Sequence, residues 1–258
     1  MIRRLIVAAL FSLLAAPAIG QAADGIFMTQ RVTAGGAPIT TVQVQIEATR
    51  MRTEMAGPDG AINVTIFDGG KQVLYIVDSA RKTYMEMTKA DVDRLSAQLQ
   101  GSAAQMQAQL EKLPPAQRAQ MEAMMKGVQL TGTGSDTVGR WTCDKYDLTI
   151  GGQKLGDVCM VNRAALGFAA TDFDVMGQMG VFYSAMATLM PNQLPGVSGF
   201  DQRGSPDFPV RTVIMMGQGQ PVMTTEVIEA GRRTFPDSLF AVPAGFTKQD
   251  LPAAMGGR

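Results

Sequence analysis

Residues 42–47 read Val-Gln-Val-Gln-Ile-Glu, so apolar and polar side chains alternate with a period of two. This period is typical of a β-strand with one buried and one solvated face. Similar stretches follow at residues 62–66, 73–77 and 83–87, and turn residues such as Asp68-Gly69-Gly70 separate them. The first third of the chain therefore predicts a meander of short strands.

Two helical regions interrupt the strands. Apolar residues recur at helical spacing over residues 89–126, and Pro114-Pro115 divides this region, which predicts a helical hairpin. Thr88 resembles the capping residue of its first helix. A further helix is expected at residues 172–190. Its apolar side chains lie nearly all round the helix, so we expect it to be buried or to bind a partner. The remaining strands are expected at residues 128–138, 143–150, 153–160, 210–216 and 222–234.

The first 22 residues have the order of a secretory signal peptide. Arg3 and Arg4 form a basic start, residues 5–14 an apolar core, and Gly20-Gln21-Ala22 a small-residue exit. Cleavage is therefore predicted after Ala22, which leaves residues 23–258 as a single exported domain in the periplasm. The alternative, a membrane anchor, requires a longer apolar stretch.

The composition excludes several function classes. The chain contains no histidine, which removes the commonest general base and most zinc sites. Basic and acidic residues number 23 each, without a basic run, so nucleic acid is not an expected partner. We therefore expect a protein that is not an enzyme and that has no cofactor and no bound metal.

Cys143 and Cys159 are the two cysteines of the chain. A reversal at Gly151-Gly152 folds the flanking strands back on one another and brings the two cysteines nearly opposite. Because an oxidising compartment favours the bond, the sequence predicts a disulfide between them.

Methionine is abundant, with 19 residues. Thioethers on one helical face can bind Cu(I) in a periplasm. They also fill irregular cores and line adaptable apolar cavities, and the absence of histidine weakens the copper interpretation. We therefore predict that methionines of the helices line an apolar cavity: Met106, Met121, Met125, Met176, Met179 and Met186.

Charged residues cluster on the strands at Arg50, Arg52, Glu54 and Glu86. A carboxylate pair in such a cluster could perform acid/base chemistry. Surface ion pairs on solvated strand faces have the same pattern, and no nucleophile accompanies these residues. We interpret the cluster as surface pairing.

Four segments carry a resemblance to a known family: Arg50 to Met55, Tyr75 to Met87, Trp141 to Tyr146, and Phe235 to Phe246. Together they resemble an exported bacterial family known as domain of unknown function 4412, which is similar to the lipoprotein carriers LolA and LolB. The resemblance implies an α+β fold, in which an open antiparallel β half-barrel is covered by the helical hairpin and the further helix over an apolar cavity. It implies no catalytic residues.

The leading hypothesis is a binding or carrier protein for an apolar ligand such as a lipid or acyl chain. The alternative is a structural or interaction protein of the envelope that docks on another protein through its apolar helix.

Overall fold

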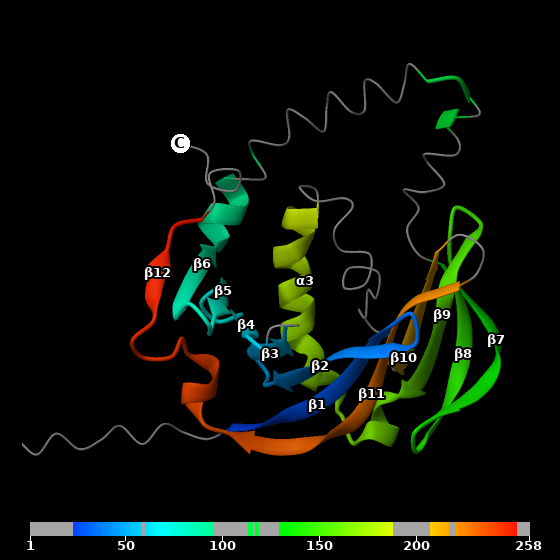
Figure 1. Ribbon diagram of the computed structural model, residues 1–258, viewed down its shortest axis with the longest axis horizontal. Coiled ribbons are helices and arrows are strands. Elements are labelled where there is room, and N and C mark those ends of the chain that lie inside the picture. The colour runs from blue at the N-terminus through cyan, green and yellow to red at the C-terminus, as the bar shows by residue number, and fades with distance from the viewer. Residues whose placement is uncertain are drawn as a thin grey trace, which may run out of the picture.

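The computed structural model of the protein describes residues 23–57, 60–94, 97, 113–115, 117–118, 129–187, 207–216 and 220–251. Within them, twelve strands form one sheet in the order β12-β6-β5-β4-β3-β2-β1-β11-β10-β9-β8-β7. All neighbouring strands are antiparallel except β12 and β6. The sheet curves strongly but stays open, because its two end strands, β12 and β7, do not pair with each other (Figure 1). This confirms the open antiparallel sheet that the sequence and the resemblance predict.

The strand that the sequence analysis missed lies at the centre of the sheet. β1 (Ala23–Ala34) pairs along its whole length with β11 (Gln220–Phe235), so the start and the end of the described chain lie side by side. On its other side β1 pairs with β2 (Ala37–Ile46). The other strands are β3 (Arg50–Ala56), β4 (Ile62–Asp68), β5 (Val73–Asp78), β6 (Thr83–Thr88), β7 (Gln129–Val138), β8 (Trp141–Ile150), β9 (Gln153–Asn162), β10 (Asp207–Met216) and β12 (Thr247–Gln249).

Helix α3 (Asp174–Ala187) stands inside the curve of the sheet (Figure 1). Its residues Val175, Met179 and Phe182 are buried in the same cluster as inward-facing residues of β1 to β5. The rings of Phe67 on β4 and Phe182 meet edge to face, with centroids 5.5 Å apart. Burial of this apolar face against the sheet holds the helix in place. We call the face of the sheet that α3 contacts the concave face.

The first α-helical residue of this region is Asp174, rather than residue 172 as predicted. A 3₁₀-helix, η2 (Ala170–Phe173), precedes it and follows another, η1 (Arg163–Leu166). The carboxylate of Asp172 accepts a hydrogen bond from the backbone N–H of Ala169, which stabilises the tighter turn. Residues 188–190 of the predicted helix lie outside the described residues.

The capping pair predicted at the start of the hairpin is present. The backbone N–H of Asp91 donates to the Thr88 hydroxyl at 3.2 Å, and the backbone N–H of Thr88 donates to the Asp91 carboxylate at 2.9 Å. These reciprocal bonds form a capping box, and residues 89–94 are helical. Most of the rest of the predicted hairpin lies outside the described residues.

The C-terminal segment forms a strap across the convex face. From Phe235 the chain passes through a 3₁₀-helix, η3 (Asp237–Phe240), to β12, which pairs with β6 at the far edge (Figure 1). The rings of Phe235 and Phe240 lie in a second apolar cluster with outward-facing residues of β4 and β5. Residues 236–246 therefore pack against the convex face of β4 and β5.

Candidate ligand-binding face

A row of apolar residues crosses the sheet from the β7 edge to its centre. Each member lies directly opposite the next on the neighbouring strand, and residues in such pairs share a face of the sheet. The apolar row consists of Leu130, Leu148, Gly156, Ile214, Met223 and Ala34. Alternation along β1 puts Ala34 on the same face as Met28, which packs in the cluster that holds α3.

The apolar row is exposed on β7 and on β11 and buried between them. Leu130 is 43% exposed and Met223 is 38% exposed, whereas Leu148 between them is buried. Gly156 at the middle is required by close packing, because a Cβ there would collide with the backbone carbonyl of Val213.

A small cluster extends the apolar row into the sheet. Leu148, Val158 and Met160 are buried together, and Tyr146 and Ile214 pack against them. Tyr146, Leu148, Val158 and Ile214 lie on the face of the apolar row by register. This face of the sheet is therefore apolar over three adjacent strands, β8 to β10.

Two of the predicted cavity methionines lie together on α3. Met179 is 7% exposed within the core, and Met176 is half-buried against the same cluster. Met186 belongs to α3, but its side chain lies outside the described residues, as do Met106, Met121 and Met125 in full. Met179 thus contacts the sheet, and the assignment of all six as cavity lining stays a prediction.

Sequence reasoning missed the apolar row. Its members come from six strands, and their alignment depends on the pairing of β1 with β11, which joins segments nearly 200 residues apart. Register shifts also occur within the β8–β9 and β10–β11 pairs. The one local signal was the exposed apolar character of residues such as Leu130 in a strand rich in Thr and Gly.

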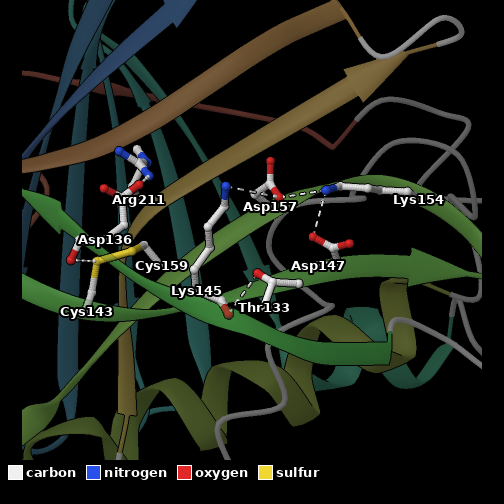
Figure 2. A network of polar contacts seen from close by, with 9 residues as sticks. All are labelled: Thr133, Asp136, Cys143, Lys145, Asp147, Lys154, Asp157, Cys159 and Arg211. Carbon is white, nitrogen blue, oxygen red and sulfur yellow. Dashed lines mark hydrogen bonds and ion pairs between the residues drawn. A yellow bond between two sulfur atoms is a disulfide. The ribbon is translucent and has the colours of Figure 1, made fainter.

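The opposite face of β8 and β9 carries the disulfide and a polar network (Figure 2). Cys143 and Cys159 are bonded, with Cα atoms 5.5 Å apart, and both are buried. The two residues are diagonal neighbours on adjacent strands, since Cys159 lies directly opposite Lys145. Both also belong to the cluster that holds α3, as does Val161 two residues after Cys159 on β9. Arg211 forms an ion pair with Asp136 beside them and so links β10 to β7 across β8 and β9.

Two carboxylates of the network lie directly opposite each other, Asp147 on β8 and Asp157 on β9. Like charges in such a pair repel, but Lys154 lies 2.7 Å from Asp147 and 2.9 Å from Asp157. The hydrogen bond from Lys154 holds the pKa of Asp147 below its ordinary value. In the same way, the hydrogen bond from Arg211 lowers the pKa of Asp136. These shifts favour the ionised forms of Asp147 and Asp136, and the ion pairs support the hairpin.

A hollow of about 300 Å³ lies next to this network, near the turn between β7 and β8. Its lining includes Arg31, Arg140, Trp141, Glu226 and Glu229. Arg140 stacks over the Trp141 ring and donates to the backbone carbonyl of Ala230, so its cation is already engaged. Among the described residues, no three acidic or cysteine side chains gather in a group that could hold a metal ion.

The charged cluster predicted on the strands anchors the C-terminal strap. Arg50 contacts Glu47 and Asp237, and its guanidinium lies 4.8 Å from the centroid of the Phe240 ring. Arg52 donates to the backbone carbonyl of Leu239 at 3.0 Å and pairs with Glu54. Glu86 pairs with Lys248 of β12 at 3.2 Å. These pairs lie under and beside the strap, so they are less exposed than the surface interpretation implied.

Burial and hydrogen bonding shift the pKa values of Glu47 and Arg50, the pair beneath the strap, in opposite directions. Glu47 is 5% exposed, and burial raises the pKa of its carboxyl even though Arg50 opposes the shift. Burial lowers the pKa of Arg50, but hydrogen bonds to Asp237 and Glu47 outweigh it and raise that pKa overall. The role of this cluster is therefore to bind the strap.

The comparison with protein families identifies the chain. The family described as "Domain of unknown function (DUF4412)" matches residues 100–246, more than half of the sequence. The chain belongs to this family. In this DUF4412 protein the matched region contains the disulfide, α3, every member of the apolar row except Ala34, and η3 of the strap. The comparison with curated proteins gave no match.

Solved structures with a similar arrangement share little sequence with this DUF4412 protein. An uncharacterized conserved protein from Thermus thermophilus has 9% identity and a TM-score of 0.46, over 88% of this chain and 90% of the other. MucB has 12% identity and a TM-score of 0.40, over 87% of this chain and 59% of the MucB chain. In the structure of the Pseudomonas aeruginosa MucA/MucB complex the TM-score is 0.38, with 12% identity over 86% and 56%. This chain thus spans less than two thirds of the MucB chains.

Proposed function

We propose that this protein is a non-enzymatic binding or carrier protein of the periplasm, which holds a lipid or acyl chain along the apolar row. The apolar row is the observation that carries the proposal. Leu130 and Met223 are large apolar side chains that water reaches, and a buried apolar cluster on β8 and β9 lies between them.

The shape of the apolar row fits a linear ligand. Neighbouring strands are about 4.8 Å apart, so the four spacings between Leu130 and Met223 span about 19 Å. A narrow strip of that length can contact a single extended hydrocarbon chain along its side.

The periplasmic location rests on the signal peptide predicted at residues 1–22, which lie outside the described residues. N-terminal sequencing of the exported protein should begin at Ala23. Within the described part of the chain, no helix is long and apolar enough to cross a membrane. A protein isolated from the membrane fraction with its leader intact would contradict the location.

The alternative, docking on a partner through the apolar helix, has less support. The apolar side chains of α3 described here face the sheet, whereas Asp174, Gly177 and Gly180 face outward. Where its side chains are described, this outward face offers a partner little apolar area.

The test combines lipid extraction with an apolar dye. Mass spectrometry of solvent extracts should find acyl lipid in protein purified from its native periplasm. The double variant Leu130→Gln/Met223→Gln should weaken dye binding about tenfold, the change that a loss of about 1.4 kcal/mol produces. Both residues are exposed, so the free energy of unfolding should change little.

The matched control is Ile62→Gln. Ile62 is 44% exposed but lies on the convex face of β4, because alternation along the strand puts it on the other face from Phe67, which packs under α3. It should leave dye binding unchanged. Equal dye binding by wild type and both variants, together with extracts free of lipid, would reject the carrier proposal.

A further inference from the structure

The two ends of the sheet differ in how they are protected. The β12 end is a strand of three residues, and Lys248 of β12 is paired with Glu86 of β6. The β7 end has ten residues, nine of them exposed or half-exposed. Among the described residues, only β8 pairs with β7. The outer edge of β7 therefore presents backbone N–H and C=O groups along most of its length.

Protein sheets usually block a free edge with lysine, proline, an inward charge or a bulge. β7 contains no lysine, arginine or proline, and Asp136, its one charged residue, is held by Arg211. One protection is present, a register shift between Gly132 and Gly134. The bulge divides the edge but leaves regular segments on both sides of it. An edge of this kind can accept another strand.

We propose that two copies of this protein pair through their β7 strands, antiparallel, around a two-fold axis. A self-paired edge must avoid like charges opposite one another, and β7 meets this condition because its remaining residues are uncharged. Thr131, Thr133 and Ser135 provide small hydroxyl side chains, which form favourable cross-strand pairs with their own kind.

A second copy fits this edge better than an unrelated extended peptide. Peptides that add to a sheet edge gain specificity from side-chain pockets beside it. Gly132 and Gly134 have no side chains, and Gly134 has no other residue within 4 Å of a Cβ position, so the edge offers no such pocket there. Pairing also covers part of Leu130, which is exposed at the start of the strand.

The test is the oligomeric state of the mature protein, measured by sedimentation velocity over a range of concentrations. Wild type should form a dimer. The variant Thr131→Lys/Ser135→Lys puts two cations on the edge of each copy and should raise the dissociation constant about tenfold or more. The matched control Thr142→Lys/Gln153→Lys adds the same charge at exposed positions on β8 and β9 and should remain dimeric.

Far-ultraviolet circular dichroism and urea unfolding of each variant check that the fold is kept. A wild-type protein that stays monomeric at every concentration would overturn the proposal and would leave the edge to a partner of another kind. A dimer that persists in Thr131→Lys/Ser135→Lys would also overturn it, because the contact would then lie elsewhere. Neither outcome depends on ligand binding, since these substitutions avoid the apolar row.

Discussion

Arg50 donates a hydrogen bond of 2.7 Å to Asp237, a residue 187 positions later in the chain. The two residues belong to two of the segments that resemble the DUF4412 family, and the contact joins these segments. One segment supplies the base of the strap, and the other supplies the strap itself. The ring of Phe240 packs against the guanidinium of Arg50 and so adds a second contact between the strap and the sheet.

Replacement of Arg50 by Met should loosen the strap. Glu47 would remain buried without its partner, and Asp237 would lose its donor, so we expect a loss of about 2 kcal/mol in the free energy of unfolding. Urea denaturation measures this loss. Arg81→Met is the matched control, because Arg81 and its partner Asp78 form a solvent-exposed pair at 3.6 Å. Equal stability of the two variants would contradict an anchoring role for Arg50.

Reduction of the disulfide should also cost stability. The bond closes a loop of 16 residues, which corresponds to roughly 3 kcal/mol in the chain-entropy description. Thiol labelling of the denatured, unreduced protein should find no free cysteine. The Cys143→Ser/Cys159→Ser variant should unfold at the same urea concentration with and without reductant, whereas wild type should shift. Two reactive thiols in the unreduced protein would rule out the bond.

The ion pairs on the disulfide face predict a pH dependence. The pKa of Asp147 is lowered when the protein folds, so its pairing with Lys154 stabilises the protein above the ordinary carboxyl pKa of 3.8. That contribution is lost as the pH falls through the lowered pKa. Lys154→Met should therefore lower the urea midpoint at neutral pH and have little effect at the acid end of the titration.

Lys89→Met provides the comparison for this pH dependence. Lys89 pairs with Asp93 at 2.6 Å, but both side chains are largely exposed, so its removal should change the urea midpoint little at any pH. If Lys154→Met lowered the midpoint equally at acid and neutral pH, packing of the lysine stem rather than its charge would be responsible.

Two glycine substitutions should have opposite effects. A side chain at Gly156 must displace the backbone of Val213, so Gly156→Ala should destabilise the protein by about 2 kcal/mol. At Gly180 on α3 no other residue lies within 4 Å of a Cβ position. Gly180→Ala should stabilise by about 0.5–1 kcal/mol, because alanine favours the helix. Thermal unfolding of both variants tests the close packing at the middle of the apolar row.

Local patterns in the sequence predicted the elements that depend on local interactions. The strands at residues 62–87 have clear alternation and turns, and Thr88 with Asp91 marks the helix start. β1 escaped prediction because it packs on both faces: Met28 contacts the core under α3, and Phe27 packs against the convex cluster. A strand buried on both faces loses the alternation that identifies it.

The sequence predicted which kinds of residue form the candidate site, but not how the strands bring them together. Met176 and Met179 were expected on the apolar face of a helix, and the structure places them there. The apolar row required the order of the strands, since Ile214 meets Met223 and Gly156 only after β10 has inserted between β9 and β11. No local pattern in one chain specifies that order.

The pairing of β1 with β11 also affects how the protein is made. A chain that emerges amino end first presents β1 nearly 200 residues before its partner β11 exists, so the two halves of the sheet can join at their centre only late in synthesis. Contacts this distant in sequence slow folding. A chain truncated before residue 220 leaves β1 with a free hydrogen-bonding edge on which aggregates can grow.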